Sequence, residues 1–72
     1  MEKQIKISSF GEVKAIMNAA MHCEEKICVH DAKGSIADAK SILGLMSLDY
    51  TKPVLLVSEN EMELAHVLSA LS

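Results

Sequence analysis

The chain has 72 residues and half of them are hydrophobic, but Phe10 and Tyr50 are its only aromatic residues, so one thin aliphatic core in a single domain over 1–72 is expected. No apolar run approaches the roughly 20 residues of a membrane span, and the opening segment MEKQIKI is too charged for a signal peptide. Seven lysines, no arginine and ten acidic residues give a net charge of −3, which argues against nucleic acid as a partner.

The first elements are a strand and a helix. Residues 3–8 (KQIKIS) place isoleucines on one face with lysines around them, which predicts a short strand. Ser9 and Glu12 form an S-x-x-E capping box, in which the glutamate is expected to fold back toward the serine. The helix that follows reaches about His22, and its apolar residues recur at helical spacing: Phe10, Val13, Ile16, Met17 and Ala20.

A hairpin is expected next, over residues 26–39. Residues 26–30 (KICVH) alternate between apolar and other side chains, which is typical of a half-buried strand. A DAKG turn around Gly34 joins them to a weaker strand over 35–39.

The last part of the chain contains two more helices and a strand. Ser41 can cap a short helix over 42–47, and residues 53–57 (PVLLV) read as a fully apolar strand. Asn60 and Glu63 form a second capping box, which opens a final helix with leucines and valine at i, i+3, i+4 and i+7.

The order β-α-β-β-α-β-α favours an α+β two-layer sandwich, in which a four-stranded antiparallel sheet carries three helices on one face. The side chains expected to supply most of the core are Ile5, Ile7, Val13, Ile16, Met17, Ala20, Ile27, Val29, Val54, Leu56, Leu64, Val67, Leu68 and Leu71.

The segment DAKSILGLMSLD at 38–49 resembles the HPr family, the histidine-containing phosphocarriers of the bacterial sugar phosphotransferase system. The likeness extends over about 24–71, and the residues that carry it are Lys40, Ser41, Ile42, Gly44, Met46, Ser47 and Leu48. The resemblance implies an HPr-like open-faced sandwich. It also implies that the second helix keeps part of its apolar surface exposed for partner proteins.

The phosphocarrier loop of the family is missing from this chain. Ser9 occupies the position of the phosphorylated histidine, Gly11 that of the arginine and Glu12 that of the proline, and the loop is shorter. Serine cannot form the labile phosphoimidazole, no arginine remains to clamp a phosphate, and Glu12 would repel one. We therefore expect neither an enzyme nor a phosphocarrier, and no catalytic residue.

The resemblance implies a regulatory and a partner-binding role for the second helix. Ser41 matches the serine that a dedicated kinase phosphorylates in Gram-positive relatives, so it is a candidate site of regulatory phosphorylation, although as a helix cap it also has a structural role. Lys40, Leu43, Met46 and Ser47 are the candidate partner-binding residues, with Ile42, Leu45 and Leu48 serving the core. The expected partners are other proteins, either phosphotransferase-system components or a transcription regulator.

Histidine and cysteine are gathered in HCEEKICVH at 22–30, a spacing that matches no recognised zinc pattern. Cys23 and Cys28 are too few for a disulfide scaffold and fit a reducing cytosol, so we expect a cytoplasmic protein. Neither a metal nor another cofactor is expected, and His22, His30 and His66 are interpreted as structural residues.

Two alternatives remain open at this point. The first is an active phosphocarrier that accepts phosphate on a non-standard residue, such as one of the three histidines. The second is a self-associating structural module that uses the apolar second helix. A third interpretation of that helix is that its apolar residues are simply core together with ordinary exposed leucines.

Overall fold

The computed structural model describes residues 1–71, and its element order is the predicted one. The elements are β1 (Glu2–Ile5), α1 (Phe10–Met21), β2 (Ile27–His30), β3 (Ile36–Asp38), α2 (Ile42–Met46), β4 (Val54–Ser58) and α3 (Glu61–Ser69). The first strand is shorter than predicted, because the chain leaves the sheet after Ile5 and buries Ile7 in the core. Within residues 1–71 no helix is both long and apolar enough to cross a membrane.

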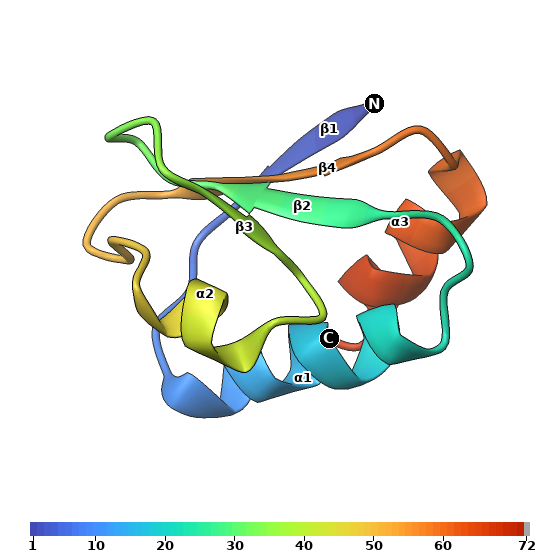
Figure 1. The fold of residues 1–72 in the computed structure, drawn as a ribbon, viewed down its shortest axis with the longest axis horizontal. Helices are drawn as coiled ribbons and strands as arrows, with labels where there is room; N and C mark the ends of the chain where they lie inside the picture. Colours follow the sequence, from blue (N-terminus) through green and yellow to red (C-terminus); the bar gives the residue numbers. More distant parts are fainter. Residues whose placement is uncertain (72) are drawn as a thin grey trace.

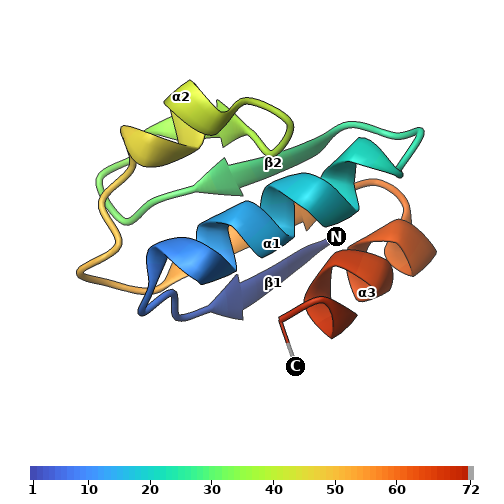
Figure 2. The same cartoon turned by 90° about the horizontal axis from the view of Figure 1, so that it is seen from below.

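The four strands form one antiparallel sheet in the order β1-β4-β2-β3. Figure 1 shows the three helices together below this sheet. Seen from the helix side in Figure 2, α1 runs across the middle, with α2 toward the β2 side and α3 toward the β1 side. The predicted α+β arrangement, a four-stranded antiparallel sheet with three helices on one face, is confirmed.

The apolar strand β4 has a clear inward face, although its sequence carries no alternation. Val54 and Leu56 are buried beneath the helices, and Leu55 and Val57 lie half-buried on the opposite face. This phase is the predicted one. It follows from the strand period of two, because a slip of one residue would exchange the two sets.

Most of the predicted core is buried, and its remaining members are only half-buried against it: Ile5, Met17, Leu68 and Leu71. The prediction omitted small residues that the structure buries where helices approach the sheet: Ala19, Cys23, Ala37 and Ala39. Small side chains have no pattern that marks them as buried, but they set how closely helices and sheet can pack.

The second predicted capping box is only half present. Asn60 caps α3, since its Oδ1 accepts hydrogen bonds from the N–H groups of Met62 and Glu63. The Glu63 carboxylate does not return to Asn60. It accepts the backbone N–H groups of Glu24 and Glu25 at 2.7 and 2.8 Å, and so ties α3 to the loop between α1 and β2.

Candidate partner-binding site

The N-terminal end of α1 carries its own polar cap. Ser9 is the N-cap, and its hydroxyl accepts the Glu12 N–H at 3.4 Å, as predicted. The Glu12 carboxylate reaches one residue further back than predicted and accepts both the N–H and the hydroxyl of Ser8, at 2.9 and 2.8 Å.

This cap supplies the helix end with a negative charge. Hydrogen bonds from the Ser8 backbone and hydroxyl hold the pKa of Glu12 below its ordinary value, so the side chain is ionised at neutral pH. A carboxylate in the first turn interacts favourably with the helix dipole. A phosphate bound at the same end would meet a like charge.

Beside this cap lies an open groove of about 450 Å³ between α1, α2 and the loop that follows α2. Its walls are largely apolar and are made by Ile7, Ser8, Ser9, Phe10, Val13, Met46, Tyr50 and Thr51. The helical spacing placed Phe10 with the apolar face of α1, but its side chain is 53% exposed at the first turn. The Lys14 ammonium lies 5.9 Å from the centre of the Phe10 ring, within reach of a cation–π interaction.

The helix α2 divides its apolar residues between two surfaces. Leu45 and Leu48 are buried and Ile42 is half-buried against the core, whereas Leu43 is 79% exposed and Met46 is 59% exposed. Ser47 is exposed as well. This distribution confirms the predicted exposure, and the partner-binding role of these side chains stays a prediction.

Close packing fixes α2 on the sheet. A Cβ added at Gly44 would lie 3.2 Å from the Ser41 hydroxyl oxygen and 3.3 Å from the Ala37 Cβ. The absence of a side chain at Gly44 therefore lets the helix approach β3. The exposed side chains of α2 therefore belong to a helix that packs closely against β3.

The two residues before α2 have structural contacts of their own. Ser41 is the N-cap, with its hydroxyl accepting the Gly44 N–H at 3.2 Å, and its exposure is compatible with the predicted phosphorylation. The Lys40 ammonium does not reach along the exposed face of α2. It donates to the Cys23 carbonyl at 3.1 Å, at the C-terminal end of α1, where the helix dipole favours a positive charge.

The histidines lie away from the groove. His22 is the C-cap of α1, His66 lies on α3, and His30 is half-buried on the outer face of β2. Burial raises the pKa of the Cys23 thiol, which donates to the Ala19 carbonyl at 3.5 Å. Among residues 1–71, no three His, Cys, Asp or Glu side chains are gathered in a way that could hold a metal ion.

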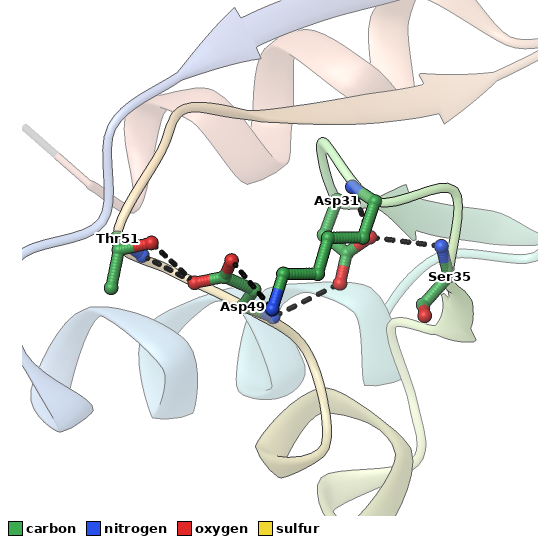
Figure 3. A network of polar contacts seen from close by, with 5 residues as sticks. Asp31, Ser35, Asp49 and Thr51 are labelled. Carbon is green, nitrogen blue, oxygen red and sulfur yellow. Dashed lines mark hydrogen bonds and ion pairs between the residues drawn. The ribbon is translucent and has the colours of Figure 1, made fainter.

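A buried aspartate, which the sequence interpretation overlooked, binds the loop after α2, whose residues Tyr50 and Thr51 line the groove. Asp31 accepts the N–H groups of Lys33 and Ser35 at 3.0 and 2.8 Å, and that of Asp49 at 3.0 Å (Figure 3). These bonds, that of Asp49 foremost, keep the pKa of Asp31 below its ordinary value. The Asp31 turn also contains Gly34, whose φ of 91° suits glycine.

The network continues into the loop after α2. The Asp49 carboxylate accepts the N–H and hydroxyl of Thr51 at 2.9 and 2.6 Å, and the Lys33 ammonium lies 3.5 Å from it (Figure 3). The Tyr50 hydroxyl donates to the Leu45 carbonyl. Since Tyr50 and Thr51 line the groove, these contacts fix the position of one of its walls.

A scan against models of known protein families gives no match for this chain, and no curated protein sequence matches it.

Proposed function

We propose that this protein is an HPr-like regulatory protein that does not carry phosphate and acts by binding another protein. The binding surface is the α1–α2 surface, defined by Phe10 and Met46, which line the open groove, and by the exposed Leu43 on α2. The observation that carries the proposal is that these three large apolar side chains are each more than half exposed. Exposed apolar surface of this kind, gathered in one place on a small domain, is typical of protein interaction sites.

The chemistry at the N-terminal end of α1 supports the absence of phosphoryl transfer. Ser9 caps the helix, and the ionised Glu12 carboxylate already supplies the favourable negative charge. No arginine exists anywhere in the chain to bind a phosphate through two hydrogen bonds.

The proposed partner is a phosphotransferase-system component or a transcription regulator in the cytoplasm. Its contact region is apolar at the centre, since the α1–α2 surface buries well only against apolar side chains. Ser41, exposed at the N-cap of α2, is the proposed point of regulation, because a phosphate there would add two negative charges at the edge of the contact.

The first experiment tests the absence of phosphoryl transfer. The protein is incubated with the general kinase of the phosphotransferase system and labelled phosphoenolpyruvate, next to an active phosphocarrier as a positive control. We expect no acid-labile label on the chain. Label on His22, His30 or His66 would contradict the proposal and favour a phosphocarrier that uses another residue.

The second experiment tests the surface with Met46→Asp. Met46 is 59% exposed, so the free energy of unfolding should change by no more than about 0.5 kcal/mol. Titration calorimetry against purified phosphotransferase-system proteins and regulators should show that binding seen with the wild type is lost, since a carboxylate would be desolvated in the contact.

A matched control uses the same substitution on another helix. Met62 on α3 is 83% exposed and does not line the groove, so Met62→Asp should leave the same binding unchanged. If Met46→Asp unfolds the protein, or if both variants bind as the wild type does, the α1–α2 surface is not the interface.

A further inference from the structure

The strand β1 has an open edge. It pairs with β4 on one side, and within residues 1–71 no strand pairs with its other side. Figure 2 shows β1 on the far side of α1 from β2, where it forms the margin of the sheet. Glu2, Lys3 and Gln4 are exposed along this margin. An open edge of this kind can accept another strand through backbone hydrogen bonds.

The register with β4 tells which backbone groups are free. The Ser58 N–H donates to the Met1 carbonyl at 2.9 Å, so these two residues are a hydrogen-bonded pair of the ladder. Such pairs alternate along antiparallel strands. The odd-numbered residues of 1–5 therefore direct their backbone groups at β4, and Glu2 and Gln4 direct theirs at the open edge, while Lys6 follows directly after the end of β1.

We propose that β1 pairs in antiparallel fashion with β1 of a second copy of this chain, with Gln4 opposite Gln4 on a two-fold axis. In this register Glu2 lies opposite Lys6 of the second copy, and by symmetry Lys6 lies opposite its Glu2. Glu2 and Gln4 use backbone groups that face the open edge, Lys6 extends the strand by one residue when the copies pair, and the outer pairs have opposite charges.

The neighbouring symmetric registers lack this charge match. A two-fold axis at Lys3 pairs Gln4 with Glu2 and brings two lysines together, whereas an axis at Ile5 pairs Gln4 with Lys6. Lysines on an edge strand usually discourage pairing with other chains. Here the lysine at position 6 selects one register, because that register alone gives it an acidic partner.

In the proposed dimer, β1 of the second copy lies next to a groove on the helix side of the sheet. It has a volume of about 480 Å³, lies between the start of β1 and one stripe of α3, and is lined by Met1, Glu2, Lys3, Glu61, Leu64, Ala65 and Leu68. In the proposed register Ile5 of the second copy lies opposite Lys3. Its side chain points to the helix side, as that of Ile5 does opposite the buried Val54. The added isoleucine therefore covers the apolar stripe of α3.

Charge reversal tests the pairing. Sedimentation velocity over concentrations up to about 1 mM should show reversible dimers of the wild type, weak because few residues pair. Glu2→Lys and Lys6→Glu each make both outer pairs repulsive, and each should weaken self-association at least about ten-fold. An equal mixture of the two variants should associate again, because each strand then carries one sign of charge and faces the other. As a control, thermal unfolding should show that both exposed substitutions leave the fold intact.

Amide exchange and a second variant locate the contact. The Gln4 N–H should become protected as concentration rises, although it takes no part in the ladder with β4. Met46→Asp should leave dimerisation unchanged, so loss of partner binding and loss of pairing can be told apart. The inference is overturned by a monomer at about 1 mM, by dimers that persist in both single variants, or by dimers that Met46→Asp abolishes.

Discussion

At its C-terminal end α1 is held by residues far away in the chain, whereas at its N-terminal end it is held by its neighbours. The Lys40 ammonium binds the Cys23 carbonyl, and the Glu63 carboxylate receives the N–H groups of Glu24 and Glu25. These contacts join α1, the loop before α2 and α3, and the Met21 side chain at this end is 61% exposed.

The N-terminal end is capped within five residues of sequence, through Ser8, Ser9 and Glu12. The groove with the exposed Phe10 and Met46 opens beside it. At the opposite end, polar contacts join α1 to distant parts of the chain instead. Long-range polar contacts also lie beside the groove, where Asp31 accepts the Asp49 N–H and the Lys33 ammonium lies close to the Asp49 carboxylate, and they fix the loop that forms one wall.

The largest loss of stability is expected from Asp31→Asn. The amide nitrogen of asparagine is a donor, so it would face one of the three backbone N–H groups that the carboxylate accepts. Since the pKa of Asp31 is lowered in the folded state, its stabilising contribution is present above the ordinary pKa and is lost as pH falls through the lower one. The melting temperature of the wild type should therefore decrease as the pH is lowered below about 4.

Comparison with the variant shows how much of this decrease in melting temperature at low pH comes from Asp31. Asp31→Asn should show a lower melting temperature at pH 7 and a flatter decline from pH 5 to about pH 2. Glu12, whose pKa is also lowered, should keep part of the decline in the variant. Identical pH profiles for wild type and variant would show that the Asp31 network does not stabilise the groove wall.

Glu63→Ala is expected to cost about 2 kcal/mol, because it removes two hydrogen bonds from backbone N–H groups to a charged acceptor. Urea unfolding measures the loss. Glu61→Ala, an exposed position in the same first turn, is the control and should change the free energy of unfolding by about 0.5 kcal/mol or less. Equal effects of the two would mean that the C-terminal end of α1 is not held by distant residues.

Ser9→Ala should cost about 1 kcal/mol or less, since the capping hydrogen bond to the Glu12 N–H is long at 3.4 Å. Partner binding should be unaffected, because the hydroxyl is used within the helix end. A loss of binding without loss of stability would instead assign the Ser9 hydroxyl to the interface.

The caps show how much of this molecule the sequence could predict. Ser9, Ser41 and Asn60 were each predicted because a cap and its N–H partners lie within three residues, a distance that a spacing pattern covers. The exposure of Leu43 and Met46 was expected from the resemblance to the HPr family, together with the spacing that assigned Ile42, Leu45 and Leu48 to the core.

The acidic residues with distant partners show where prediction ended. The Glu63 carboxylate was expected to bind within its own turn, but its donors lie 38 and 39 residues away along the chain. Asp31 and Asp49 are 18 residues apart, and each also fits an ordinary turn. No local pattern distinguishes a carboxylate that caps its own turn from one that reaches another element, because the fold brings the donors together.

Phe10 combines a small expected effect on stability with a direct test of the groove beside the N-terminal end of α1. Its ring is 53% exposed and its polar neighbour is Lys14, whose cation–π contact is worth about 0.5–1 kcal/mol at an exposed site. Phe10→Ala should therefore cost about 1 kcal/mol at most, yet it should weaken partner binding as Met46→Asp does, because aromatic side chains anchor interfaces. Combining Phe10→Ala with Met46→Ala shows whether the two side chains contact the same part of the partner. If the losses of binding free energy in the two single variants add up to more than the loss in the double variant, both side chains contact one partner element. If Phe10→Ala instead unfolds the domain, the ring belongs to the core and does not form part of an exposed binding surface.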